Sequence, residues 1–96
     1  MNVEYSNRAT SDLHKIAADS RTFGAAVTEA VEVRIRNAIA YIAEHPEASP
    51  EVHGRPGMRM APLVRYPCLI FYRVFDDRIR IVHIRHTSRR PWQGVR

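Results

Sequence analysis

The sequence predicts a single α+β domain over residues 1–96. Its elements follow the order β-α-α-β-β-β, with an N-terminal helical hairpin packed on a small, mainly antiparallel sheet. Three observations lead to this prediction. Apolar residues recur at every third or fourth position over 23–42, as in an amphipathic helix. Two β-type runs, 69–75 and 78–86, are separated by only two acidic residues. The 96 residues suffice for one hydrophobic core and leave no room for a second.

The first elements are a short strand and a helix. Residues 3–6 (Val-Glu-Tyr-Ser) alternate between apolar and polar, which predicts a strand. Ser6 or Asn7 can cap the helix that follows, and the polar run 19–21 ends it. The narrow apolar stripe of this helix is formed by Ala9, Leu13, Ile16 and Ala17.

A second helix is predicted over 23–42. Ser20 or Thr22 can cap it, and it ends at His45 because the residue before a proline disfavours helical geometry. Since only a few residues separate the two helices, we expect an antiparallel hairpin. The apolar stripe of the second helix is formed by Phe23, Val27, Ala30, Val31, Ile35, Ala38, Ile39 and Ile42.

The second half of the chain predicts the sheet. A polar loop over 46–57, with three prolines and two glycines, leads to β-type runs over 59–65, 69–75 and 78–86. In the last run, strict alternation places Arg80, Val82, Ile84 and His86 on one face. It places Ile79, Ile81, His83 and Arg85 on the other face. Because both faces carry apolar residues, we expect this strand in the centre of the sheet.

Charge is distributed unevenly along the chain. Residues 55–96 hold ten arginines and two acids, a formal charge of +8, whereas residues 1–54 hold five basic and eight acidic residues, a formal charge of −3. Nearly all of this basicity is arginine, whose planar guanidinium group binds phosphate and carboxylate. The asymmetry predicts a surface that meets a negatively charged partner.

Several classes of function are disfavoured. A single cysteine, Cys68, excludes an intrachain disulfide and a zinc–thiolate site, and its apolar surroundings predict a core position. His83 and His86 lie three residues apart and would point to opposite faces of a strand, so we expect no metal ion. The sequence contains no phosphate-binding loop and predicts no cofactor. With no long apolar stretch and no signal-peptide pattern, we expect a cytoplasmic protein.

What remains is a set of basic residues near aromatic ones. This set can meet either nucleic acid or an acidic protein, because arginine binds phosphate and carboxylate alike. It can also cleave RNA, with histidine or tyrosine as acid or base and arginine stabilising the phosphorane. Its members are Arg59, Arg65, Arg73, Arg85, His86, Arg89, Arg90 and Trp92, with Tyr66 and Tyr72 nearby in sequence.

At these residues the chain resembles the RelE/ParE superfamily of type II toxins, and the resemblance covers nearly its whole length. The motifs that carry it are 65–74 (RYPCLIFYRV), 81–86 (IVHIRH) and 89–92 (RRPW). Cys68 departs from the family pattern, which has an aromatic residue at that position. The resemblance implies the α+β fold predicted above.

Within the superfamily, the chain is most similar to ParE-type toxins. The RelE-type mRNA endonucleases usually carry an arginine where this chain has Leu69, and many end their last strand with a tyrosine where it has Thr87. They also carry lysine before the sheet, whereas the one lysine here is Lys15. The resemblance therefore implies a non-enzymatic inhibitor of DNA gyrase, neutralised by a ParD-like antitoxin.

The resemblance also suggests which residues make these contacts. For the target we expect Arg85, His86, Arg89, Arg90 and Trp92. For the antitoxin we expect Leu13, Ile16, Ala17, Arg59, Arg65 and Arg73. The alternative is a ribosome-dependent mRNA endonuclease, in which His86 is the acid or base and Arg73 or Arg85 stabilises phosphate.

Overall fold

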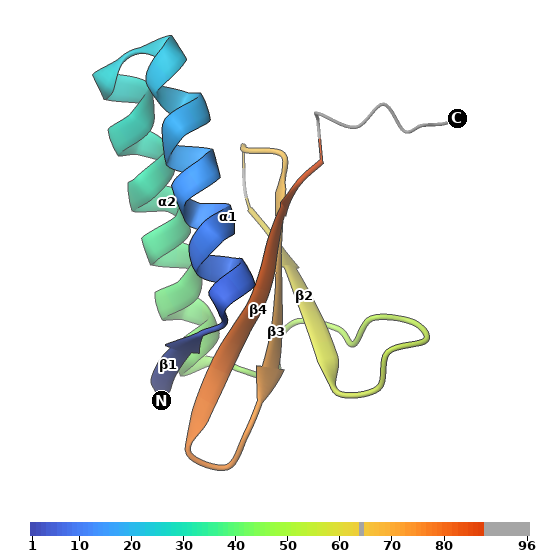
Figure 1. The fold of residues 1–96 in the computed structure, drawn as a ribbon. Coiled ribbons are helices and arrows are strands. Elements are labelled where there is room, and N and C mark those ends of the chain that lie inside the picture. Colours follow the sequence, from blue (N-terminus) through green and yellow to red (C-terminus); the bar gives the residue numbers. More distant parts are fainter. Residues whose placement is uncertain (64, 88–96) are drawn as a thin grey trace.

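The computed structural model, which describes residues 1–63 and 65–87, consists of a helical hairpin lying against a four-stranded sheet (Figure 1). The strands lie in the order β1-β4-β3-β2; β1 is parallel to β4 and the other pairs are antiparallel. The predicted α+β order, the hairpin and the central position of the last strand are confirmed. The elements are β1 (Asn2–Tyr5), α1 (Asn7–Ser20), a short 3₁₀ helix (Arg21–Phe23), α2 (Ala25–Glu44), β2 (Met58–Pro62), β3 (Cys68–Val74) and β4 (Arg78–His86).

Ser6 connects β1, α1 and β4. Its hydroxyl oxygen accepts a hydrogen bond from the backbone N–H of Ala9 (2.9 Å), which caps α1 as predicted. The same hydroxyl donates to the carbonyl oxygen of Val82 (2.7 Å), and the Ser6 backbone N–H donates to that of Ile81 (3.0 Å). The start of α1 is therefore fixed directly to the central strand.

The connection between the helices differs from the prediction. The residue that caps α2 is Gly24, with φ of 105°, a region that glycine adopts without steric strain. The hydroxyls of Ser20 and Thr22 instead donate back to carbonyl oxygens at the end of α1, so the predicted caps are wrong. Phe23 lies in the 3₁₀ helix with 75% of its surface exposed, and Ala30 is also exposed, so neither belongs to the buried stripe.

The core lies between the hairpin and the helix-facing side of the sheet. Cys68 is buried as predicted, and burial raises the pKa of its thiol, which disfavours the reactive thiolate. No helix in the described ranges has the length and apolar character needed to span a membrane. The buried residues that form one contiguous core are Ala9 and Ile16 of α1, Val31, Ile35, Ile39 and Ile42 of α2, Leu63 just after β2, and Cys68, Ile70, Tyr72, Ile79, Ile81 and Ile84 of β3 and β4.

A β-bulge interrupts the pairing of β3 with β4. Phe71 pairs with His83, but the next residue, Tyr72, pairs with Ile81. Val82 is therefore an extra residue in β4, with no partner of its own in β3. Such a bulge inverts the alternation of side chains on the strand that contains it.

The bulge overturns the predicted faces of the last strand. Ile84 is buried against the helices with Ile79 and Ile81, whereas His83 and Arg85 turn to the opposite side. We call that opposite side, which faces away from the helices, the open face. The prediction that His83 and Arg85 share a face with Ile81 is wrong, because strict alternation holds only as far as the bulge.

The β2–β3 connection is tighter than predicted. Strand β2 ends at Pro62, and the backbone N–H of Leu63 donates to the carbonyl oxygen of Cys68 (2.9 Å). The predicted run over 59–65 is therefore too long. Arg65 has φ of 74°, and of the described non-glycine residues it alone adopts a positive φ.

Replacing Arg65 by glycine is expected to raise the free energy of unfolding by up to about 1 kcal/mol, because glycine removes the clash that the left-handed region imposes on a Cβ atom. Arg65→Ala is the matched control, since it removes the side chain but keeps the Cβ atom. Urea unfolding followed by circular dichroism measures both. Equal stabilisation by alanine and glycine would contradict the backbone explanation.

Candidate functional site

The open face of the sheet carries most of the described arginines of the second half of the chain. Its β1 end holds an ion cluster in which Glu4 accepts hydrogen bonds from Arg78 (3.2 Å) and Arg80 (3.0 Å). Asp77 accepts a further one from Arg78 (3.0 Å). The hydrogen bonds from Arg78 and then Arg80 lower the pKa of the Glu4 carboxyl group.

Glu4→Gln is expected to destabilise the fold at about pH 7 and to have no effect once the medium is acid enough to protonate Glu4 in the folded protein. Because the pKa of Glu4 is lower in the folded than in the unfolded protein, ionised Glu4 stabilises the fold at pH values above the ordinary carboxyl pKa. That contribution is lost as the pH falls through the folded-state value. Thermal unfolding of both proteins between about pH 7 and pH 3 measures the difference. A difference that stays constant over this range would contradict the prediction.

Near the other end of the open face, α1 and β4 bring Asp12 and His83 together. The Asp12 Oδ2 atom lies 2.6 Å from the Nδ1 atom of His83 and accepts a hydrogen bond from the backbone N–H of Ile84 (2.9 Å). The Nε2 atom of His83 lies 3.4 Å from the Nη2 atom of Arg8. Since a guanidinium group only donates, this arrangement places the proton of a neutral His83 on Nδ1.

Phe71 supports His83 and Arg85 from the neighbouring strand. The rings of Phe71 and His83 are stacked, with centroids 5.7 Å apart and an angle of 14° between their planes. The guanidinium carbon of Arg85 lies 5.6 Å from the centre of the Phe71 ring. His83 and Arg85 thus contact one aromatic side chain, while Arg8 and Asp12 reach the His83 ring from α1. No group of three potential metal ligands occurs in residues 1–63 or 65–87.

The residues predicted for RNA cleavage do not come together. Arg73 and Arg85 both lie on the open face. They are separated along the sheet, because Arg85 pairs with Leu69 near the start of β3, whereas Arg73 lies near the end of that strand and pairs with Met58. Arg73 donates to the carbonyl oxygen of Pro56 (3.2 Å). His86 turns to the helix-facing side, where it lines a small cavity of about 160 Å³ with Phe23, Val27, Tyr66 and Cys68.

The residues predicted for antitoxin binding lie in three separate places. Leu13, Ile16 and Ala17 line a groove of about 280 Å³ between α1 and α2. Arg59 donates to the carbonyl oxygen of Ser49 (2.5 Å) and holds the 46–57 loop. Arg65 is exposed in the β2–β3 turn, and Arg73 lies on the open face. Arg89, Arg90 and Trp92, predicted for the target, lie outside the described residues.

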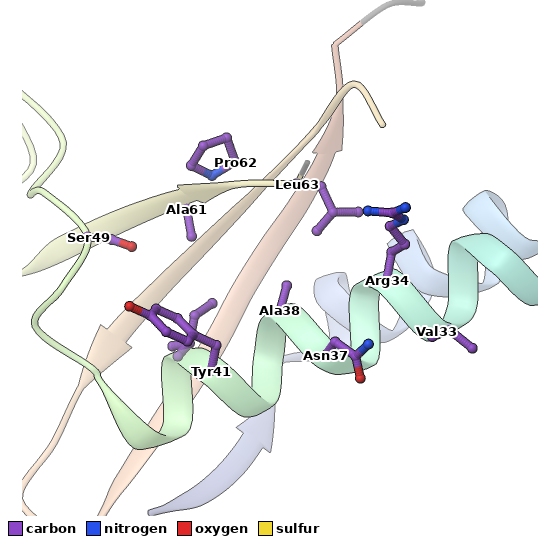
Figure 2. A pocket seen from close by; sticks show the side chains of 10 residues that line it. Val33, Arg34, Asn37, Ala38, Tyr41, Ser49, Ala61, Pro62 and Leu63 are labelled. Carbon is purple, nitrogen blue, oxygen red and sulfur yellow. The ribbon is translucent and has the colours of Figure 1, made fainter. Parts of the chain in front are cut away.

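Sequence reasoning missed a larger groove between α2 and the end of β2. Its volume is about 680 Å³ (Figure 2). Figure 2 shows Ala38 and Tyr41 of α2 on one side and Ala61 and Leu63 on the other. Tyr41 is 57% exposed and Val33 40% exposed. Exposed apolar side chains beside a groove are typical of a protein-binding surface. The residues that line it are Val33, Arg34, Asn37, Ala38, Tyr41, Ile42, Ser49, Ala61, Pro62 and Leu63.

One signal for this groove was present in the sequence. Val33 and Tyr41 are apolar residues that lie outside the buried stripe of α2, so the packing of α2 on the sheet does not account for them. No local signal indicated Asp12 and His83, because 71 residues separate them.

Comparisons with known proteins agree with this fold. A family model described as the ParE toxin of the type II toxin–antitoxin system parDE matches residues 3–91. The chain is similar to a structure of the chromosomal ParDE system of P. aeruginosa, with 21% identity, a TM-score of 0.75, and 90% of this chain and 95% of that one covered. It is also similar to a chain of the E. coli RelBE toxin–antitoxin complex, with 18% identity, a TM-score of 0.65, and coverage of 92% and 98%.

A chain of the E. coli DinJ–YafQ complex has 15% identity and a TM-score of 0.63, with 97% of each chain covered. At such identities these structures establish a shared fold. No curated protein sequence matches the chain. Because the family model covers nearly the whole chain, the protein belongs to the ParE family of toxins from type II toxin–antitoxin systems.

Proposed function

We propose that this toxin acts in the cytoplasm by inhibiting DNA gyrase, and so replication, without cleaving nucleic acid itself. Membership of the ParE family is the observation that carries the proposal. The opposite orientations of His86 and Arg85 support it, because acid–base chemistry and phosphate stabilisation must act on the same phosphodiester.

We further propose that a ParD-like antitoxin neutralises the toxin by occupying the groove between α2 and β2. Two structures that share this fold are described as toxin–antitoxin complexes. The groove combines exposed apolar residues, Val33 and Tyr41, with the cation of Arg34. An amphipathic, acidic segment of an antitoxin that folds on binding would match both features.

Beside the groove lies β2, an outer strand of the sheet. Residues of the 46–57 loop already bond to its first part, through Val52 to Met58 (2.7 Å) and through Met60 to Pro50 (3.2 Å). The end of β2 at Ala61 and Pro62 borders the groove. A segment bound there would contact both α2 and β2.

The decisive experiment is gyrase supercoiling of relaxed plasmid with purified toxin, with and without its antitoxin. We expect inhibition, or trapped cleaved DNA, that the antitoxin reverses. Absence of any effect with the toxin in excess over gyrase would overturn the proposal. Cleavage of translated mRNA that disappears in His86→Ala would instead establish the RelE-like alternative.

Removing the segment from Arg89 onward, or replacing Arg89 and Arg90 by alanine, is expected to relieve growth inhibition and leave antitoxin binding intact. These residues follow the last described strand and carry two of the cations predicted to contact the target. Induced growth curves and co-purification with the antitoxin measure the two effects. Loss of soluble, folded protein would show that the segment has a structural role instead.

A further inference from the structure

The open face carries arginines of two kinds. Arg78 and Arg80 share the carboxylate of Glu4, so their charge is largely neutralised within the fold. Arg8 and Arg85 form no ion pair with any carboxylate in residues 1–63 and 65–87; their contacts are to the rings of His83 and Phe71. Cations without counter-ions on one face of a sheet form a place where an anion is favoured.

Arg8 contacts His83, and Arg85 contacts Phe71, the ring on which His83 is stacked. Arg8 lies in the first turn of α1, 3.4 Å from Nε2 of the imidazole ring. Arg85 lies two residues beyond His83 on the same side of β4, and both contact the ring of Phe71, at 5.6 and 5.7 Å. The bulge in β4 creates this arrangement, because it turns His83 and Arg85 to the open face.

We propose that Arg8, His83 and Arg85 form a binding site for a phosphate group, such as that of a nucleic-acid backbone or of a free nucleotide. The two guanidinium groups donate to phosphate oxygens, for which their planar geometry is suited. The Nε2 atom of His83 lies 3.4 Å from the Arg8 guanidinium and holds it at the open face. This site is additional to gyrase inhibition and does not depend on it.

Asp12 positions the imidazole for this role. Its Oδ2 atom is fixed by the backbone N–H of Ile84 (2.9 Å) and holds Nδ1 of His83 at 2.6 Å, which leaves Nε2 directed at Arg8.

Phosphate fits this site better than the carboxylate of an acidic protein does. The two guanidinium groups come from different elements on either side of the His83–Phe71 pair. A phosphate group offers several oxygens to them, whereas a carboxylate offers two. The carboxylate already present, Asp12, binds from the side away from Arg8, at Nδ1. A nucleic-acid backbone presents such groups in series, and its affinity would depend steeply on salt.

The test uses the purified full-length toxin and a fluorescent single-stranded DNA of about 12 nucleotides, followed by fluorescence anisotropy. Inorganic pyrophosphate serves as a competitor, and a glutamate-rich peptide of equal charge tests protein carboxylates. Arg8→Gln and Arg85→Gln are each expected to weaken DNA binding about tenfold. Arg80→Gln is the matched control, because it removes one positive charge from the same face but outside the site.

The role of His83 has its own test. In His83→Asn the amide nitrogen can still donate to Asp12, but the Nε2 atom that holds the Arg8 guanidinium is lost. This variant is expected to weaken DNA binding about as much as Arg8→Gln does, with an unchanged circular dichroism spectrum. Competition by pyrophosphate would assign free phosphate compounds as ligands, and its absence would assign the backbone alone.

Three outcomes would overturn the proposal. Arg80→Gln could weaken binding as much as Arg8→Gln and Arg85→Gln, which would indicate a diffuse basic surface. The peptide could bind as tightly as the DNA, which would indicate an acidic protein partner. His83→Asn could bind DNA as tightly as the wild type, which would show that the imidazole does not hold Arg8 in the site.

Discussion

Tyr72→Ala is expected to lower the free energy of unfolding by about 3–5 kcal/mol, a large part of the stability of a domain of this size. Tyr72 is fully buried in β3, between α2 and the sheet, and lies in the central part of the core. Its hydroxyl donates to the carbonyl oxygen of Pro46 (2.8 Å), just beyond the end of α2. One side chain thus fills the core and fixes the start of the 46–57 loop.

Tyr72→Phe separates these two contributions. It keeps the ring but leaves the carbonyl oxygen of Pro46 without this donor, so we expect a loss of about 1 kcal/mol. Urea unfolding of the three proteins measures both steps. Equal losses for alanine and phenylalanine would show that the hydroxyl, and not the ring, supports the fold.

Tyr41→Asp is expected to weaken antitoxin binding by about a hundredfold and to leave the fold intact. Aromatic residues beside a groove commonly contribute the largest share of binding energy at protein interfaces. Tyr41 is 57% exposed and lines the α2–β2 groove, so its removal takes little from the core. The new carboxylate would also repel an acidic antitoxin segment.

Ala40→Asp is the matched control for this variant. Ala40 is exposed one position earlier in α2 and does not line the groove. Both changes place a negative charge near the C-terminus of the helix, where the macrodipole disfavours it about equally. Isothermal titration calorimetry with the antitoxin measures the affinities. If the two variants bound equally well, the antitoxin would occupy another surface, and the groove between α1 and α2 that Leu13 lines would be tested next.

Local sequence determined where several elements begin or end. Ser6 caps α1 and His45 ends α2, both as predicted, because capping and the restriction imposed by Pro46 act within a few residues. The last strand has its predicted bounds, Arg78–His86, since a two-residue acidic turn fixes its start. The helical period likewise identified α2, although it wrongly included Phe23, which turns outward before Gly24.

Only the tertiary structure determined which face of the sheet each side chain of β4 occupies and which distant residues it contacts. A bulge at Val82 depends on how β4 pairs with β3, and it sends His83 and Arg85 to the open face and His86 toward the helices. Asp12 meets His83 across 71 residues, through the packing of α1 on the edge of β4. Periodicity along one strand cannot indicate either feature. The residue types were therefore readable from the sequence, but the sites they form depend on contacts between distant elements.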